Sequence, residues 1–352
     1  MQYELQSRPV PDPGSGAIVA VEACGVSGTD LAIYTGRSKP ALPIVPGHEV
    51  VGRIAAIGPE ASRRWQVAPG DRVLVGSSLA CGRCQPCLRG GLCVEPAPGR
   101  PATYGYRDPE EWPGLWGGFA THMYLPSHAS IRPIRTDVPV GEASLFNVLG
   151  NAWHWIVEVG EVRSHDAVLI LGPGPRGLAC AALAAAAGVT RLAVLGLPHS
   201  KTRLAAAQKV GATHVVAAPP EECVEAIRDS GFGLPSLVVD ATSGGDVLDA
   251  VVPLVPAGAR LVLGGLRMGR PVQLSGPSLD RVVVAELTIR GARSSPRSAM
   301  EMAAQLIEGG SLPLGAIATD RVGLTGIGPA LAEWETLEDK PVHLRVEPSA
   351  GT

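Results

Sequence analysis

The sequence predicts an α/β protein with a β-rich first part followed by a doubly wound parallel sheet. Its 352 residues suffice for two domains with sizeable cores, because a domain usually has about 100–200 residues. Up to about Leu149, short apolar runs alternate with turn residues. Beyond it, apolar runs alternate with helical segments of about ten residues, which is typical of βαβ units and a parallel sheet.

The first part is predicted to contain short strands separated by turns. Ala17–Ala23 shows enough alternation for a strand, and Val50–Ile57 is a second strand, closed by Gly58-Pro59. The turn Pro69-Gly70-Asp71 leads into a third strand at Arg72–Val75.

A long Pro- and Gly-rich stretch, Pro96–Gly118, contains several aromatic residues. Loops of this length are usually functional or disordered, and the aromatic residues favour a packed loop that lines a pocket. These residues are Tyr104, Tyr106, Trp112 and Trp116. They suggest a bulky or flat substrate, with simple anchoring of the loop as the alternative.

The second part is predicted to begin with a buried strand at Asp166–Leu171 and an Ala-rich helix at Gly177–Ala187, which ends at Gly188. The same alternation continues to the end of the predicted sheet. The further strands are Leu192–Leu197, Val215–Ala218, Leu237–Ala241 and Arg260–Leu263, and the further helices are Lys201–Val210 and Val247–Val255.

Composition excludes several classes of function. The 30 Lys and Arg against 33 Asp and Glu argue against a nucleic-acid-binding protein, which normally has a basic excess. No uninterrupted apolar run reaches the ~18–20 residues needed to span a bilayer. Met1–Glu22 lacks a charged-then-apolar leader, so we expect a cytoplasmic protein in which disulfide bonds are unlikely.

A glycine motif indicates dinucleotide binding. Gly172-Pro173-Gly174-Pro175-Arg176-Gly177 follows a predicted strand and opens a predicted helix. The glycines permit a tight turn and let a pyrophosphate approach backbone N–H groups at the helix N-terminus. Because strand, helix and next strand are all in place, we predict a Rossmann dinucleotide-binding unit rather than a structural turn.

The segment after the next strand favours NADP(H) over NAD(H). An acidic residue that binds the adenosine ribose is expected ~20 residues after the glycines, but this position is Gly196 and no carboxylate is near. Basic and hydroxyl groups follow instead, at His199, Ser200, Lys201 and Arg203. They could bind a 2′-phosphate, although an ordinary solvated helix start is the alternative and NAD is not excluded.

Four of the seven cysteines form a metal-binding pattern. Cys81, Cys84, Cys87 and Cys93 have the close spacing of a tetrahedral thiolate zinc site with no open position. Closed coordination makes this zinc structural, and an iron–sulfur cluster is the alternative from spacing alone. Cys180 and Cys223 lie on helical patterns and are expected to be buried or to have no special role.

The glycine motif and the four cysteines, together with further motifs in the same order, make the chain resemble the zinc-type medium-chain dehydrogenase/reductase family. The nearest likeness is to its threonine, sorbitol and polyol dehydrogenases. The further motifs are Gly28-Thr29-Asp30, Gly47-His48-Glu49, Gly70-Asp71-Arg72-Val73, Gly117-Gly118-Phe119-Ala120, Gly150-Asn151-Ala152, Val239–Gly244, Glu286–Gly291 and the C-terminal strand near His343–Val346.

The resemblance implies a GroES-like catalytic domain at residues 1–148 that includes a structural zinc lobe at residues 81–93. It also implies a Rossmann domain at residues 149–291 and a C-terminal segment, residues 292–352, that completes the catalytic domain. It further implies a nicotinamide cofactor and a small-molecule substrate in the cleft, and a homodimer or homotetramer. Asn151 and Thr242 match positions expected beside the cofactor.

The resemblance also exposes a degenerate catalytic zinc site. His48 and Glu49 match, but Ser27 stands at the position of the first cysteine ligand and Asn147 at that of the third ligand. Zinc prefers thiolate, imidazole and carboxylate ligands, so replacing two anions should weaken its binding strongly. Alternatives are a weak site that uses Glu49 beside His48, or Cys24 as a substitute ligand, although Cys24 should face the wrong way.

The family's proton path is altered as well. Thr29 matches the hydroxyl group of this path, but Ala32 replaces its histidine. Protons must then leave through water, His48 or another group near the cleft. His154 is one candidate, with simple packing in a helix as the alternative.

Three functions remain open. The first is hydride transfer between NADP(H) and a small alcohol or carbonyl substrate, in which Ser27, Thr29, Asn147 and protonated His48 replace zinc as stabilisers of the oxygen's charge. The second is zinc-independent reduction of an activated C=C or iminium bond. The third is a catalytically silent nucleotide-binding protein.

Overall fold

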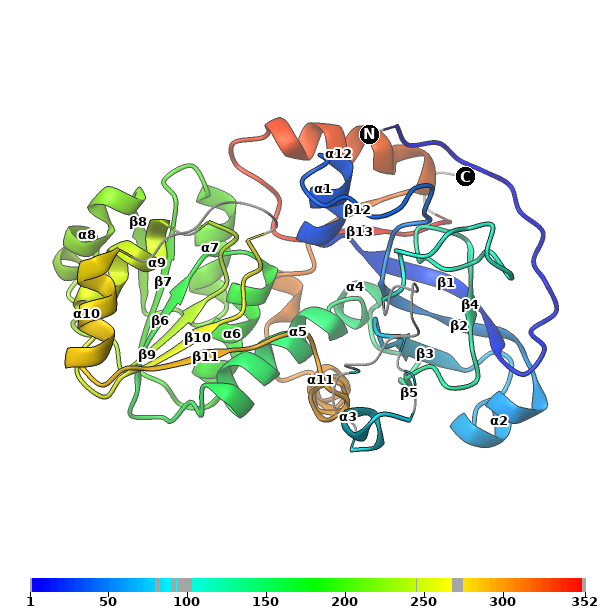
Figure 1. Ribbon diagram of the computed structural model, residues 1–352, viewed down its shortest axis with the longest axis horizontal. Helices are drawn as coiled ribbons and strands as arrows, with labels where there is room; N and C mark the ends of the chain where they lie inside the picture. The colour runs from blue at the N-terminus through cyan, green and yellow to red at the C-terminus, as the bar shows by residue number, and fades with distance from the viewer. Residues whose placement is uncertain are drawn as a thin grey trace.

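The computed structural model describes residues 2–79, 81, 83–89, 93, 103–244, 246–267 and 275–349. Strands within these ranges form two sheets, which lie at opposite ends of the elongated molecule (Figure 1). This arrangement confirms the predicted α/β class, with a β-rich part and a parallel sheet.

The first sheet has the order β12-β13-β1-β2-β3-β5, with β4 paired to β1 beside this path. Its strands are β1 Ala17–Gly25, β2 Glu49–Ile57, β3 Arg72–Val75, β4 His122–Leu125, β5 Ile131–Pro133, β12 Asp320–Val322 and β13 Leu344–Val346. Strand β1 pairs antiparallel with β2 on one side; on the other it pairs with β4 near Ala17 and with β13 near Cys24. Strands from the C-terminal segment therefore complete this sheet, while the exact boundaries 1–148, 149–291 and 292–352 stay a prediction.

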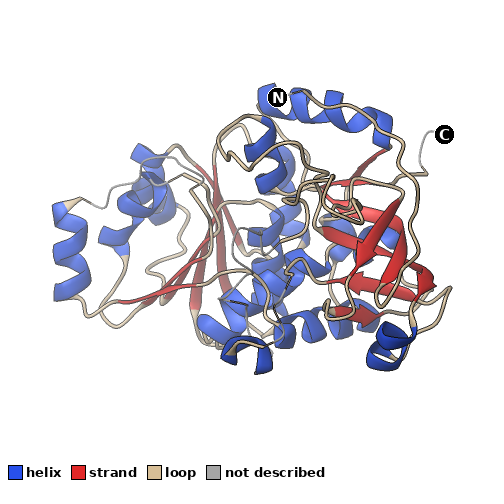
Figure 2. Cartoon of the chain, turned by 45° about the vertical axis from the view of Figure 1, so that its right-hand side comes forward, coloured by secondary structure: helices blue, strands red, loops and turns tan. Residues whose placement is uncertain are grey.

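The second sheet is parallel throughout and has the order β11-β10-β9-β6-β7-β8. Its strands are β6 Ala167–Leu171, β7 Arg191–Gly196, β8 His214–Ala217, β9 Leu237–Asp240, β10 Arg260–Leu263 and β11 Thr288–Gly291. Every residue of β6 is buried. Val168 and Ile170 pack into one hydrophobic core and Leu169 into another, since helices cover both faces of the sheet (Figure 2).

The helices connect and cover these sheets. They are α1 Gly28–Tyr34, α2 Pro59–Trp65, α3 Gln85–Leu88, α4 Val140–Ala143, α5 Phe146–Ala152, α6 Pro175–Ala186, α7 Lys201–Lys209, α8 Cys223–Asp229, α9 Asp246–Val251, α10 Gly276–Val284, α11 Arg297–Gly309 and α12 Ile327–Thr336. A π-helix, η1 Trp153–Val159, continues α5. Short 3-10 turns are η2 Pro220–Glu222, η3 Val252–Leu254, η4 Leu314–Ala316 and η5 Leu324–Gly326.

Two features differ from the sequence expectations. Gly58-Pro59 does end β2, but Pro59 also starts helix α2, because proline is well suited to the first helical position, where its missing N–H has no partner to lose. Helix α5 is buried along its whole length and has no polar face, so its sequence lacks the amphipathic pattern that predicts a helix.

Candidate active site

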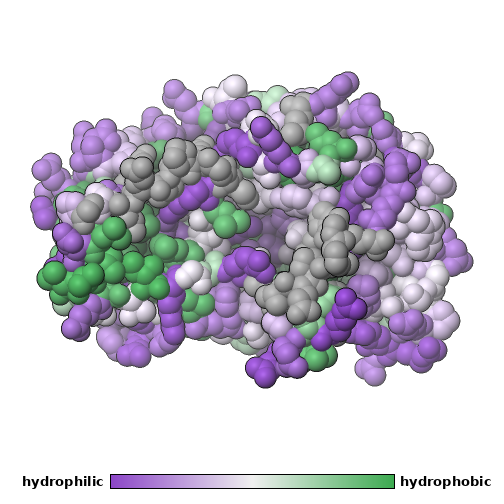
Figure 3. All heavy atoms as spheres, in the orientation of Figure 1, coloured by the Kyte–Doolittle hydropathy of each residue, from purple (hydrophilic) through white to green (hydrophobic). Residues whose placement is uncertain are grey.

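A cavity of about 1310 Å³ lies between the two sheets and is lined from both of them. Figure 3 shows the surface hollowed between the two parts. On the parallel-sheet side, the cavity meets the carboxyl ends of the strands, where β7 lies on one side of β6 and β9 on the other. Ligands of doubly wound sheets bind at such a switch point in the strand order.

The glycine turn after β6 forms the centre of this side. Gly172 has φ +95°, and a Cβ at Gly177 would lie 2.0 Å from the Gly172 carbonyl oxygen, so these two glycines shape the turn itself. Gly174 differs, because its φ is −72° and a Cβ there would meet nothing within 4 Å. Its bare backbone faces the open cavity at the start of α6, which fits a cofactor diphosphate.

Positive side chains surround the end of the cavity beside β7 and α7. Arg203 lines it and donates from Nε to the Pro341 carbonyl (3.0 Å), while burial lowers its pKa to about 10. Lys340 lies nearby, and burial followed by repulsion from Arg203 and Arg37 lowers its pKa. Gly196, His199 and Ser200 also line this end, as do the acidic Glu335 and Glu338. The sequence did not point to Arg37 and Lys340, because both are far from α7 in sequence and neither belongs to a motif.

Ser27 serves as the N-cap of α1 in a capping box with Asp30. Its hydroxyl donates to Asp30 Oδ2 (2.6 Å) and accepts from the backbone N–H groups of Thr29 and Asp30. Ser27 lines the cavity, but its proton is already held within the chain. The pattern Ser-x-x-Asp is itself a sequence signal for this cap.

His48 and Glu49 lie at the start of β2 and are both buried. His48 Nδ1 has no hydrogen-bond partner among the described residues and lies 3.9 Å from Asp30 Oδ1. Glu49 accepts from Arg176 Nη2 (3.3 Å), a residue of the opposite part of the chain. Burial raises the pKa of Glu49, and the positive charges of Arg176 and His48 oppose that rise.

A chain of amides lies along α5. Asn151 Nδ2 donates to Asn147 Oδ1 (2.9 Å), and Asn147 Nδ2 donates to Ser77 Oγ (3.3 Å). All three residues line the cavity. Sequence reasoning identified both asparagines but not Ser77, which follows β3 after a single glycine and carries no motif.

His343, one residue before β13, is almost fully buried in the same cavity. Burial, helped by Arg345 and Arg176, lowers its pKa to about 3, so this imidazole is neutral near pH 7. Neither of its ring nitrogens has a hydrogen-bond partner among the described residues.

The depressed pKa of His343 predicts a loss of stability in acid. The unfolded chain binds this proton below about pH 6.5 and the folded chain only near pH 3. Stability is therefore present above pH 6.5 and falls between these values, by up to about 1.4 kcal/mol per pH unit. Melting temperatures measured between neutral pH and about pH 5 should fall less for His343→Asn than for the wild type. Equal falls would contradict this assignment.

The four cysteines of the predicted zinc lobe come together as expected. Their Sγ atoms all lie within 4.8 Å of one another, and Cys81 Sγ is 3.9 Å from Cys87 Sγ. Tetrahedral thiolates around zinc would be about 3.8 Å apart. Backbone N–H groups of Arg83 and Cys84 lower the pKa of the Cys81 thiol. Among the described residues, no second group of three or more His, Cys, Asp or Glu side chains converges in this way.

Comparison with known proteins agrees with this geometry. Residues 13–135 match the family model described as "Alcohol dehydrogenase GroES-like domain", and residues 175–309 match "Zinc-binding dehydrogenase". The Mycobacterium tuberculosis protein named "Probable alcohol dehydrogenase adh" is 38% identical over 337 residues, which cover 93% of this chain and 90% of that protein. The chain belongs to the zinc-type medium-chain dehydrogenase/reductase family.

Other members of the zinc-type medium-chain dehydrogenase/reductase family are similar over nearly the whole chain. An erythritol/L-threitol dehydrogenase of Mycolicibacterium smegmatis is 30% identical over 345 residues, covering 92% of this chain and 88% of the relative. A zinc-binding dehydrogenase structure from Sinorhizobium meliloti, bound to NADP, has a TM-score of 0.80 and 26% identity, covering 97% of this chain and 94% of that one. This family member is therefore an NAD(P)-dependent oxidoreductase of small molecules.

Three residues considered in the sequence analysis do not line the cavity. Lys201 is exposed and does not line the cavity. His154 does not line it either, because its Nδ1 faces Glu158 one helical turn away (2.6 Å). Cys24 is buried in the core of the first sheet and, as predicted, faces away from the cavity.

The prediction of an aromatic loop lining the pocket is largely wrong for the described residues. Of its four aromatic residues only Tyr106 lines the cavity. Tyr104 is fully buried in the first core, Trp116 packs edge-on against Tyr124, and Trp112 is exposed. The loop's residues 96–102 lie outside the described ranges.

The helices of the described residues were also compared with the length and apolarity that a membrane span requires. None of them meets both requirements.

Proposed function

We propose that this protein transfers hydride between NADP(H) and the carbonyl or alcohol carbon of a small organic substrate, without a zinc ion in the cleft. The absence of a zinc ion from the cleft is argued from Ser27 and Asn147, whose polar groups are already hydrogen-bonded within the chain. The Ser27 hydroxyl donates a hydrogen bond to Asp30, while Asn147 donates to Ser77 and accepts from Asn151. Neither offers an anion, so a divalent cation at His48 and Glu49 would lack two of its usual ligands.

The cofactor, when bound, supplies or accepts the hydride at its nicotinamide ring. We assign the cofactor diphosphate to the backbone at Gly174. Asn151 and Thr242, which also line the cavity, are assigned as further cofactor contacts. Thr29 is the hydroxyl donor available to the substrate oxygen, since the structure records no side-chain hydrogen bond from it to the described residues. His48, whose Nδ1 has no hydrogen-bond partner among the described residues, is a second polar group at this end of the cleft.

A panel of ketones and enones tests this proposal. Wild-type protein should oxidise NADPH in the presence of at least one ketone, and metal analysis should find zinc for the four-cysteine lobe alone. Turnover confined to enones would favour reduction of an activated C=C bond. Tight NADPH binding with no turnover on the whole panel would favour a silent nucleotide-binding protein.

We also propose a preference for NADP(H) over NAD(H), supported by Arg203, Lys340 and Arg37 at one end of the cavity. A 2′-phosphate there would gain charge-assisted hydrogen bonds worth about 1.5–3 kcal/mol each. Arg203→Gln is therefore expected to weaken NADPH binding about 10- to 100-fold and NADH binding far less. Fluorescence titration of both cofactors checks this. Lys201→Ala, which alters an exposed side chain, should change neither affinity, and equal losses for both cofactors in Arg203→Gln would contradict the preference.

We propose that the protein forms a homodimer or homotetramer through the β11 edge of the parallel sheet. Leu279, Val283 and Val284 of α10 are exposed, and an apolar patch covers this end of the molecule (Figure 3). Strand β11 is last in its sheet, so its outer backbone groups are unpaired among the described residues.

Val283→Asp is expected to shift the protein toward the monomer, because a charge on this face would have to be desolvated in the interface. Sedimentation velocity measures the change. Val10→Asp, at an exposed valine of the first part, is the matched control and should keep the native mass. A wild-type monomer would rule out this interface.

A further inference from the structure

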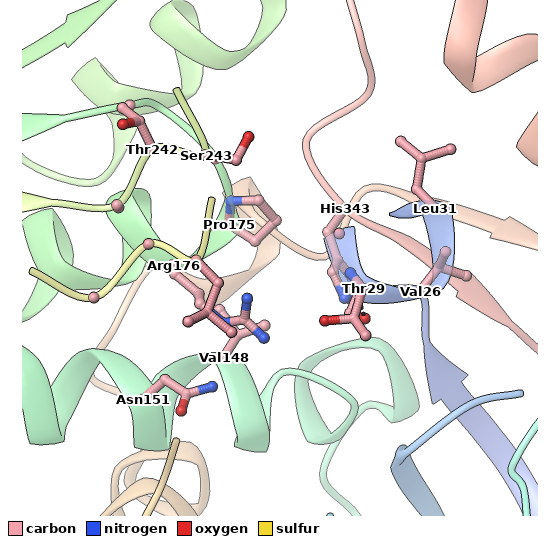
Figure 4. Close-up of a pocket in the computed structure, with 18 of the residues that line it drawn as sticks. Val26, Thr29, Leu31, Val148, Asn151, Pro175, Arg176, Thr242, Ser243 and His343 are labelled. Carbon is pink, nitrogen blue, oxygen red and sulfur yellow. Dashed lines mark hydrogen bonds between the residues drawn. The ribbon is translucent and has the colours of Figure 1, made fainter. Parts of the chain in front are cut away.

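Arg176 places a positive charge in the floor of the cleft, where the glycine turn otherwise presents backbone. It is the second residue of α6, and its side chain leaves the parallel-sheet part to reach Glu49 on β2 of the first sheet. Figure 4 shows its guanidinium in the space between Asn151 on one side and Thr29 and His343 on the other. The Arg176 side chain is 32% exposed to this space, whereas Glu49 behind it is 1% exposed.

The guanidinium has unused hydrogen-bonding capacity. Of its five N–H donors, the structure records one hydrogen bond to the described residues, from Nη2 to Glu49, and at 3.3 Å this bond is long for an ion pair. Within the described part of the chain, Arg176 Nε is buried without a hydrogen-bond partner, as are His48 Nδ1 and Asn151 Oδ1. Buried polar atoms normally have partners, so several orphaned ones around one cavity indicate a place for a polar ligand.

The other polar groups of the cleft are neutral or lie away from the His48–Glu49 pair. Ser27 and Asn147 are neutral and already bonded within the chain, and His343 is neutral near pH 7. Arg203 and Lys340 surround the end of the cavity beside α7, a region suited to phosphate groups. Arg293 also lines the cavity, where its Nη2 donates to the Cys93 carbonyl (3.5 Å). Among the described residues, Arg176 is the cation that forms an ion pair with Glu49.

We propose that Arg176 is a catalytic residue whose guanidinium stabilises the negative charge that develops on the substrate oxygen, in the role of the missing zinc. Glu49 is the positioning residue that holds the guanidinium across the cleft. The proposal rests on the function proposed above. In the reducing direction, the carbonyl carbon gains a hydride from the reduced nicotinamide and the C=O π pair moves onto oxygen. The oxygen then takes a proton from solvent through Thr29 or His48, while Arg176 keeps its own proton.

This assignment predicts anion binding that does not depend on turnover. Benzoate carries a negative oxygen on a small planar carbon group, as the reacting centre does. In calorimetry, the wild-type complex with NADPH should bind benzoate, and Arg176→Ala should bind it at least about 10-fold more weakly. NADPH affinity itself should stay within about twofold. Glu49→Gln should tighten benzoate binding, because the guanidinium charge is no longer shared with a carboxylate.

Kinetics supply the second readout. With a carbonyl substrate identified from the panel, Arg176→Ala should lower kcat by about 10²–10³, and added guanidinium ion at non-denaturing concentration should restore part of it. Arg191→Ala, which removes an exposed positive charge at the opposite end of β7, should behave as the wild type.

Two results would overturn the proposal. One is weaker NADPH binding with unchanged kcat in Arg176→Ala, since Arg176 would then hold the cofactor diphosphate. The other is absence of benzoate binding to the wild-type complex. A wild type that binds NADPH and benzoate but reduces no carbonyl or enone would instead refute the proposed function and leave the anion site intact.

Discussion

Replacing Cys84 with serine is expected to release zinc, lower the melting temperature and damage the substrate end of the cleft. Structural zinc contributes about 10–16 kcal/mol of binding free energy in small zinc domains, and this energy is coupled to folding, so weakening the site by one thiolate is expected to destabilise the lobe. Cys93 lines the cavity, so the zinc lobe supplies part of its wall. NADPH binding should survive, because the glycine turn belongs to the other sheet.

Metal analysis, thermal melting and NADPH titration of the same preparations check this expectation. The wild type should contain about one zinc per chain. Cys223→Ala, which changes a buried thiol outside the cluster, should keep its zinc. Two zinc ions per wild-type chain would contradict the zinc-free cleft, and full zinc content in Cys84→Ser would contradict the role of the four cysteines.

Side chains added at two glycines of the same turn are expected to affect different properties, cofactor affinity at Gly174 and stability at Gly177. Gly174→Val should fold normally, since its φ of −72° suits any residue and its Cβ would meet nothing within 4 Å. The new side chain would occupy the space for the cofactor diphosphate, so NADPH affinity should fall about 10-fold or more. Gly177→Ala should instead destabilise the fold by about 1–3 kcal/mol or more, because its Cβ would lie 2.0 Å from the Gly172 carbonyl oxygen.

Thermal melting separates the two effects from each other, and fluorescence titration measures the affinity. Unchanged NADPH binding in Gly174→Val would show that the cofactor does not approach this backbone. Unchanged melting in Gly177→Ala would show that the turn can relax around a methyl group.

The parts of the fold that sequence could predict are those with a local signal. Strand β6 and helix α6 were predictable because a short buried apolar run and a glycine motif follow one another directly. The zinc lobe was predictable because its ligands lie within thirteen residues. Helix α5 could not be predicted in this way, because it is buried on all sides and its sequence lacks the helical periodicity of apolar and polar residues.

The residues of the candidate site could be predicted from the sequence, but their hydrogen-bond partners could not. Family motifs pointed to Ser27, His48, Glu49 and Asn147, and all four line the cavity. Their hydrogen bonds depend on segments far away in sequence: Glu49 meets Arg176, and Asn147 meets Ser77. No local pattern encodes such contacts, and they decide which donors remain free for a substrate.

The pairing of β1 with β13 joins the first strand of the described chain to the last. The N-terminal strands leave the ribosome long before β12 and β13 are synthesised, so the edge of β1 near Cys24 stays open until those two strands emerge. The strands of the parallel sheet, β6 to β11, come before β12 in sequence, so all of them are synthesised earlier. Assembly on the ribosome should therefore finish the parallel sheet first, and the cavity would be enclosed only after β12 and β13 have emerged.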